Sequence, residues 1–164
     1  MTLNARNQEL VAVYASQGRR LQAQLALCPK EMWEFKTVPE HWSIREVLHH
    51  LADAELNFVL RIRFALGEPG APIHSFDQEA WGRNLQYAAR EPETALALYE
   101  ALGADTQALL SRLSDAEFEK TVQHPQRGPL TVAYLVGFCD VHLKKHLEQI
   151  QRRLKEWKER NPSV

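Results

Sequence analysis

The sequence has few cysteines, no long apolar run and no excess of charge of either sign. Its two cysteines, Cys28 and Cys139, are too few for a disulfide framework and form no Cys-x-x-Cys pair, so we expect reduced thiols. The chain has 20 Lys and Arg residues and 21 Asp and Glu residues, so it lacks the excess of positive charge that is typical of proteins that bind nucleic acid. Because no apolar segment approaches the length of a membrane span or a signal peptide, we expect a cytoplasmic protein that does not enter a membrane.

The composition is that of a globular protein. Hydrophobic residues make up 45% and charged residues 25%, without any low-complexity block, which argues against disorder and against a fibrous repeat. A chain of 164 residues can bury one hydrophobic core without disulfides or structural metals. We therefore expect a single domain over residues 1–164.

The apolar residues recur with helical spacing, and no strand pattern of useful length appears. They predict long helices over about residues 3–27, 44–67, 92–113 and 131–158. Ser43 and Glu46 form a capping-box pattern at the start of the second, and Thr131 begins the last. The segment "TVQHPQRGPLT" is interpreted as a loop because of its Pro and Gly residues. The predicted fold class is all-α.

A long connection separates the second and third predicted helices. The segment "EPGAPIHSFDQEAWGRNLQYAAREP" contains three prolines and one short helix that Asp77 could cap. In a four-helix bundle, two parallel neighbouring helices must be joined by a crossover that spans the length of the bundle. The connection is therefore consistent with a bundle that has a crossover between helices two and three.

Two histidines fall on or beside the apolar stripe of the last helix. His146 lies inside the stripe and His142 at its edge. They can hydrogen-bond to carboxylates or backbone across the bundle, or they can bind a metal, because side chains at i and i+4 have Cβ atoms about 5–6 Å apart. A third metal ligand would have to come from another helix, and the sequence offers His49 and His50, between which helical-wheel arithmetic does not choose.

Other histidine and cysteine patterns are less informative. Leu143 follows His142, so the His-Glu-x-x-His motif of zinc proteases is absent and a metalloprotease is disfavoured. We expect Cys139 to be a core residue rather than a metal ligand or a nucleophile. The remaining histidines lie in or beside loops and are expected to be structural or exposed: His41, His74 and His124.

Three segments together resemble one known family. "HWSIREVLHHLADAE" resembles the Trp-Ser-x-x-Glu-x-x-x-His-Leu-x-Asp-x-Glu signature of the DinB/YfiT-like superfamily of metalloenzymes. "QHPQRGPLTVAYLVGFCDVHLKKHLEQI" is similar to the closing pattern of that superfamily, a His-Pro turn with Gly followed by a helix ending His-x-x-x-His-Leu-x-Gln-Ile. "PIHSFDQEAWGRNLQY" resembles the crossover of the YfiT-like branch, so the resemblance covers most of the chain from residue 41 onward.

This resemblance implies a fold and a metal site. The family fold is an up-down-down-up four-helix bundle, usually a homodimer, in which three histidines bind one divalent metal ion, often nickel or zinc. The helix-two ligand of the family pattern precedes Leu-x-Asp, which selects His50, and His142 and His146 occupy the other two ligand positions. Asp53 and Glu55 also match family positions, where they are expected to orient a ligand or to serve helix packing.

The resemblance also implies three classes of function, which the sequence leaves open. A three-histidine site keeps an open position, where a metal ion can lower the pKa of bound water to about 7 or hold a thiol as thiolate. The similarity to the bacillithiol-transferase branch favours a thiol S-transferase that joins a low-molecular-weight thiol to an electrophile. The alternatives are a metal-dependent hydrolase and a non-enzymatic metal-binding or dimerisation bundle. Arg61, on the same helix face as His50, is a candidate anion contact, but a surface salt bridge is the favoured explanation for it.

Overall fold

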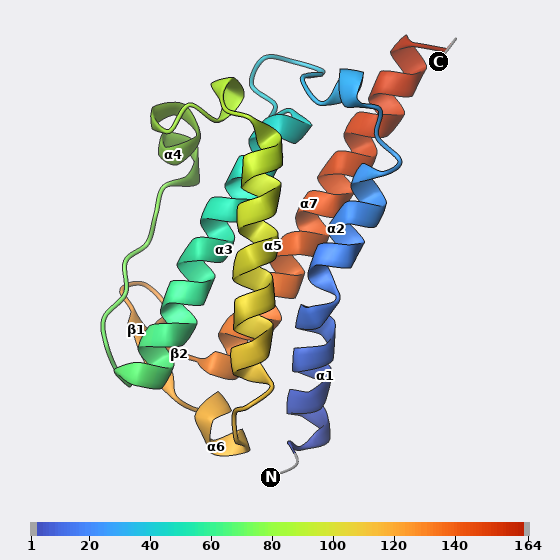
Figure 1. Ribbon diagram of the computed structural model, residues 1–164. Coiled ribbons are helices and arrows are strands. Elements are labelled where there is room, and N and C mark those ends of the chain that lie inside the picture. The colour runs from blue at the N-terminus through green and yellow to red at the C-terminus, as the bar shows by residue number, and fades with distance from the viewer. Residues whose placement is uncertain (1–2, 163–164) are drawn as a thin grey trace.

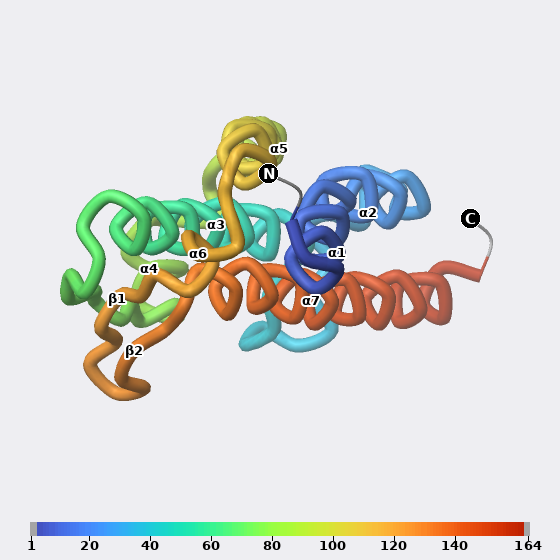
Figure 2. The backbone as a smooth tube through the Cα atoms, turned by 90° about the horizontal axis from the view of Figure 1, so that it is seen from below, coloured from blue at the N-terminus to red at the C-terminus, as the bar shows by residue number. Residues whose placement is uncertain are grey.

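The computed structural model describes residues 3–162, and its main elements are long helices that pack side by side. The chain rises through α1 (Ala5–Ala15) and α2 (Gln17–Leu25), descends through α3 (Ile44–Gly67), descends again through α5 (Pro92–Leu110) and rises through α7 (Val132–Arg160) (Figure 1). Figure 2 shows the same bundle from below, with α5 beside α3 and the α1–α2 pair beside α7. The prediction of an all-α four-helix bundle is confirmed. None of the helices in the described range is long and apolar enough to cross a membrane.

The predicted helix starts are confirmed by their hydrogen bonds. The Ser43 hydroxyl accepts a bond from the Glu46 N–H, and the Glu46 carboxylate accepts one from the Ser43 N–H, which completes the capping box of α3. The Thr131 hydroxyl caps α7, and Asp77 caps the short helix α4 (Gln78–Asn84). Pro92 occupies the first turn of α5, where its missing N–H costs no hydrogen bond.

The first predicted helix is not continuous, so the expectation of one helix over residues 3–27 is wrong. The α-helical pattern is interrupted at Ser16, between α1 and α2. The Ser16 hydroxyl donates to the carbonyl of Val13 at 2.7 Å, and the Ser16 N–H donates to the same oxygen at 3.1 Å. A serine hydroxyl that donates to a backbone carbonyl three residues earlier competes with the regular hydrogen bonds of the helix.

The segment interpreted as a loop contains a β-hairpin, so this expectation is also wrong. Strands β1 (Thr121–His124) and β2 (Gly128–Thr131) pair antiparallel, with His124 opposite Gly128, whose φ is +70°. Hydrogen bonds from the crossover extend the hairpin: the Gln123 N–H donates to Ala71 O at 2.9 Å, and the Ile73 N–H donates to Gln123 O at 3.0 Å. These partners lie about fifty residues away, so strand periodicity within the segment could not predict them.

The crossover between α3 and α5 is fastened at both ends. Its beginning pairs with β1 as described, and near its end a 3-10 helix (Tyr87–Ala89) buries Tyr87. The Tyr87 hydroxyl donates to the Asp53 carboxylate at 2.5 Å. The connection is thus an ordered part of the fold, and Asp53 serves to hold it against α3.

The hydrophobic core has two clusters, and the middle of α3 and α7 lies between them. One surrounds Phe58 and Phe118 near the hairpin and the short helix α6 (Asp115–Phe118), and the other surrounds Leu48 and Ile150. Cys139 belongs to the first cluster, where its thiol contacts the carbonyl of Leu135 at 3.2 Å, which confirms that it is a core residue.

Candidate metal centre

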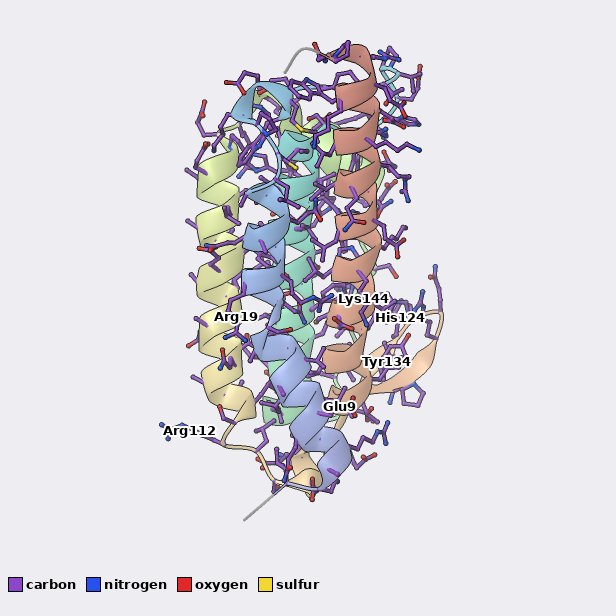
Figure 3. All side chains as sticks on the ribbon, turned by 90° about the vertical axis from the view of Figure 1, so that its right-hand side faces the viewer. Glu9, Arg19, Arg112, His124, Tyr134 and Lys144 are labelled. Carbon is purple, nitrogen blue, oxygen red and sulfur yellow. The ribbon has the colours of Figure 1, made fainter. Side chains whose placement is uncertain are left out.

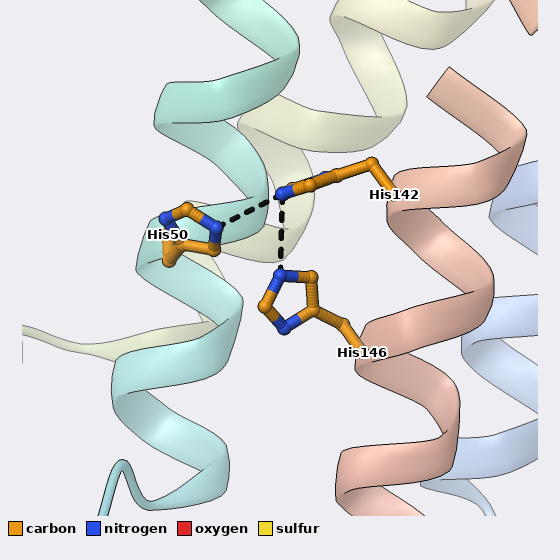
Figure 4. Close-up of side chains that lie close together, drawn as sticks. All are labelled: His50, His142 and His146. Carbon is orange, nitrogen blue, oxygen red and sulfur yellow. Dashed lines mark hydrogen bonds between the residues drawn. The ribbon is translucent and has the colours of Figure 1, made fainter. Parts of the chain in front are cut away.

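Three histidines from two helices converge between the two core clusters. His50 extends from α3, whereas His142 and His146 extend from successive turns of α7 (Figure 4). The Nε2 atom of His142 lies 3.0 Å from that of His50 and 3.2 Å from that of His146. One donor nitrogen from each ring lies within 4.8 Å of the other two. The structure thus brings together the three residues that the sequence predicted as ligands.

The spacing of these nitrogens fits one bound ion. Two imidazole nitrogens held about 2.0–2.1 Å from the same ion, in tetrahedral directions, lie about 3.3 Å apart. The two measured separations, 3.0 and 3.2 Å, are close to that value. The rings therefore need only small movements to coordinate a common ion.

The proton positions also favour a cation. His146 Nδ1 lies 2.9 Å from the side-chain oxygen of Gln149, an acceptor, so Nδ1 carries the hydrogen and Nε2 directs a lone pair into the cluster. His142 Nε2 carries at most one hydrogen and cannot satisfy both of its nitrogen neighbours. A divalent cation would accept all three lone pairs. Gln149, whose role the sequence did not reveal, thereby fixes the ligand form of His146.

The environment keeps all three rings neutral. Burial and the charges of the other two histidines lower the pKa of His50 to about 2, and burial together with the charges of His146 and Lys145 lowers that of His142 to about 3. Burial likewise lowers the pKa of His146. A neutral imidazole is the form that binds metal, so no proton competes for the cluster at pH 7.

The carboxylates of the α3 motif do not orient the ligands. Asp53 bonds to Tyr87, and buried Glu55 accepts a hydrogen bond from the Tyr14 hydroxyl. His50 Nδ1 is buried and has no hydrogen-bond partner among the described residues. The His50 ring instead packs against Trp42, with ring centroids 4.8 Å apart. Of the two roles expected for Asp53 and Glu55, the structure supports helix packing.

The other histidines lie outside the cluster. His49 stacks on Tyr87, and its Nε2 atom lies 3.2 Å from the carbonyl of Arg90. His41 and His74 are exposed, as expected. His124, which was expected to be only structural or exposed, is partly buried and lines a hollow beside the cluster.

That hollow gives the cluster access to solvent. It has a volume of about 500 Å³, within the range of ligand pockets, and His50 and His142 form part of its wall. Arg61 also lines it and donates to His74 O at 2.8 Å, and it forms none of the salt bridges among residues 3–162. Arg127 of the hairpin and Lys145 of α7 are the other two Lys or Arg residues that line it, and neither belongs to a motif that points to a site.

The chain is similar to bacterial proteins named for metal-dependent hydrolysis. A protein of Oceanobacillus iheyensis, "Putative metal-dependent hydrolase", is 33% identical over 118 residues, which are 71% of this chain and 68% of the relative. YfiT of Bacillus subtilis, which is also named a "Putative metal-dependent hydrolase", is 31% identical over 110 residues, which are 66% of this chain and 62% of the relative. The matches thus span about two thirds of these relatives.

Solved structures share the fold. That of Bacillus subtilis YfiT, described as having an unusual four-helix bundle topology, superposes with a TM-score of 0.84 at 23% identity, over 95% of this chain and 90% of that one. The mycothiol-dependent maleylpyruvate isomerase superposes with a TM-score of 0.73 at 13% identity, over 92% of this chain and 63% of that one. The family model of the DinB superfamily matches residues 14–150, most of the 164 residues. The chain therefore belongs to the DinB superfamily.

Proposed function

We propose that the protein is a divalent-metal-dependent thiol S-transferase in which His50, His142 and His146 bind the metal ion. The observation that carries the proposal is the convergence of three neutral histidines, two of which, His50 and His142, line an open hollow. Imidazole donors suit zinc and nickel, which are the proposed metals. When bound, such an ion lowers the pKa of a coordinated thiol or water and so provides a nucleophile at neutral pH.

The chain's own residues would hold the ion and limit the access of water. Gln149 keeps the Nε2 lone pair of His146 directed at the ion. Phe58 packs edge-on against the His142 ring, with centroids 5.4 Å apart, and Phe138 packs against Phe58 at 5.6 Å. These rings make the approach to the cluster apolar, which strengthens electrostatic interactions within the site.

The space around the cluster supports a reaction of two substrates. One hollow reaches His50 and His142, and a second hollow of about 540 Å³ reaches His146. Gln78 and Lys145 line both. A transferase must hold a thiol and an electrophile at one ion, and two adjoining hollows offer a place for each. The shared fold with a mycothiol-dependent isomerase is consistent with a thiol as one substrate.

A metal-dependent hydrolase is the second candidate, and the names of the two sequence relatives favour it. It would use the same three ligands, with water in place of the thiol. The two candidates therefore differ in the co-substrate and not in the residues of the site.

The first test is metal content. Protein purified without a histidine tag is analysed for bound metal, alongside the His50→Ala and His142→Ala variants and a control, His74→Ala, which changes an exposed histidine outside the cluster. We expect about one divalent ion in wild type and control and loss of the ion in both cluster variants. Wild type without affinity for any divalent ion would instead favour the non-enzymatic bundle.

The second test separates the two activities. Metal-loaded protein is assayed for conjugation of monochlorobimane with several low-molecular-weight thiols, and for ester hydrolysis without thiol. Conjugation that His142→Ala abolishes supports the transferase, whereas hydrolysis without any conjugation contradicts it and supports the hydrolase.

We also propose a homodimer, on the basis of the family resemblance alone. Sedimentation equilibrium at micromolar concentration should give twice the mass of the 18.9 kDa chain. A monomer under these conditions would contradict the proposal.

A further inference from the structure

The formally charged side chains that line the hollow beside His50 and His142 are all positive. Its lining includes Arg61, Arg127 and Lys145 but no Asp or Glu from the described residues. The whole chain has nearly equal numbers of acidic and basic residues, so this composition departs from the average surface. The second hollow, beside His146, differs, because three glutamates line it together with its cations. An excess of positive over negative side chains is thus found at only one of these two approaches to the cluster.

Two arginines in the hollow come from distant parts of the chain. Arg61 lies on α3 and is partly buried, whereas Arg127 lies in the turn of the hairpin. Burial and the charge of Arg127 lower the pKa of Arg61, as expected for two cations that face each other without a carboxylate between them. Nothing in the described structure neutralises this pair.

Most donors of both guanidinium groups remain free. Arg61 donates to His74 O at 2.8 Å, and Arg127 donates to the Tyr134 hydroxyl at 3.1 Å. A guanidinium group has five N–H donors, so each arginine keeps several for a ligand. The bonds that are formed fix the position of each side chain without neutralising its charge.

His124 contributes a further donor to the same wall. Its Nδ1 atom accepts a hydrogen bond from the Gln126 N–H at 3.1 Å, so the remaining ring hydrogen is on Nε2. Figure 3 shows His124 on the hairpin and Tyr134 at the start of α7, where the hairpin lies beside the helix. The hairpin therefore presents hydrogen-bond donors to the hollow.

Between the donors and the histidine cluster the wall is aromatic. The Arg127 guanidinium lies 5.7 Å from the centre of the Phe138 ring, and the Arg61 guanidinium lies 5.9 Å from that of Phe58. Phe58 in turn contacts the His142 ring. The hollow thus leads from a cationic end, along an apolar wall, to the three convergent nitrogens.

We infer that this hollow binds a substrate that carries an anionic group, a carboxylate or a phosphate, on an apolar body, and that Arg61 and Arg127 bind the anion. The inference rests on the proposed function, because it places the reacting end of the substrate at the histidine cluster. It makes the β1–β2 hairpin the element that determines substrate specificity, and it assigns Arg61 to anion binding rather than to a surface salt bridge.

Binding of small aromatic probes tests the inference separately from metal binding. Isothermal titration compares 3-phenylpropionate, phenylphosphonate and the neutral 3-phenylpropionamide, on metal-loaded and on chelator-treated protein. Chelator-treated protein is included because a carboxylate can also bind a metal ion. We expect at least one anion to bind about 10-fold or more tighter than the amide in both forms, since a charge-assisted hydrogen bond provides a preference of that order. The preferred anion identifies the carboxylate or the phosphate as the group recognised.

Variants then locate the binding residues. Arg61→Gln and Arg127→Gln should each remove most of the preference for the anion while the metal content is unchanged. Arg112→Gln, at an exposed arginine outside the hollow, should retain it. Equal affinity for anion and amide in the wild type, or an undiminished preference in the Arg61→Gln/Arg127→Gln double variant, would overturn the inference. Loss of metal binding with retained anion preference would count against the proposed function alone.

Discussion

At the scale of single residues, Gln149 is the partner that orients a proposed metal ligand, His146. Its side-chain oxygen lies 2.9 Å from Nδ1 of His146 and determines which ring nitrogen is free to bind an ion. Partners of this kind commonly change metal affinity when they are removed, because they hold the ring and raise its basicity.

Replacement of Gln149 by Leu is expected to weaken metal binding by about 10–100-fold. The physical reason is loss of the acceptor for the His146 Nδ1–H, which frees the ring to rotate and to change tautomer. Competition with a chromophoric chelator measures the affinity. Gln107→Leu, at an exposed glutamine of α5, is the matched control and should leave the affinity unchanged. Equal affinities in the two variants would contradict the assigned role.

Glu55 is a second residue with an unusual environment. It is only 4% exposed, and burial raises its pKa to about 7 although the Tyr14 hydroxyl donates to it. In the folded state the carboxyl of Glu55 therefore stays protonated up to about pH 7. In the unfolded chain it loses its proton near pH 4.5, its ordinary pKa. Because the folded state binds more protons in this window, Glu55 makes folding less favourable as pH rises through it.

As pH rises from 4 to 7.5, the free energy of unfolding of the Glu55→Gln variant should therefore increase relative to that of wild type by about 3 kcal/mol. Urea unfolding of both chelator-treated proteins at several pH values measures this difference. The difference is the informative quantity, because the buried histidines have lowered pKa values and make both proteins less stable in acid. A difference that does not change with pH would show that Glu55 is ionised in the fold.

At the scale of elements, two helices carry glycines that packing does not require. Gly18 in α2 and Gly103 in α5 border the same cavity of about 240 Å³, and a Cβ atom at either would meet no heavy atom within 4 Å. Gly137 in α7 differs, because a Cβ atom there would lie 3.4 Å from Leu10 of α1. Gly18 and Gly103 therefore weaken their helices, and no neighbouring element packs closely enough to require a glycine at either position.

Gly103→Ala is expected to raise the free energy of unfolding by about 0.5–1 kcal/mol, because alanine loses less backbone entropy in a helix. The measurement is urea denaturation. Gly137→Ala serves as the comparison and should gain less, since the new methyl group presses on Leu10. A larger gain at Gly137 than at Gly103 would show that the packing around α7 is looser than described.

At the scale of the whole molecule, the histidine cluster connects α3 to α7 between the two halves of the core. A metal ion bound there would link two helices whose contributing residues lie about ninety positions apart. Since the unfolded chain does not hold this arrangement, binding of the ion should favour the folded state.

Metal at about 1,000 times its dissociation constant should stabilise the protein by about 4 kcal/mol. Thermal unfolding with and without added zinc or nickel, after removal of bound metal, would show the increase in melting temperature. His124→Ala, outside the cluster, should keep this increase, and His142→Ala should lose it. An equal increase in both variants would show that the metal stabilises the protein elsewhere.

Local sequence predicted those features that depend on neighbouring residues. The capping box at Ser43 and the caps at Asp77 and Thr131 could be predicted, because each depends on hydrogen bonds within one helical turn. The hairpin was missed because the crossover, not β2 alone, satisfies the backbone of β1. The break at Ser16 was missed because a serine of this kind is also common inside helices.

The sequence by itself determined the all-α class and the helical spacing of His142 and His146. A resemblance between motifs, rather than the periodicity, selected His50 over His49. Only the tertiary structure decided that the three Nε2 atoms meet, that Gln149 fixes one ring, and that Arg61 and Arg127 line the same hollow. The reason is physical: helical periodicity fixes the direction of a side chain around its own axis, whereas distances between α3, α7 and the hairpin depend on how the whole core packs.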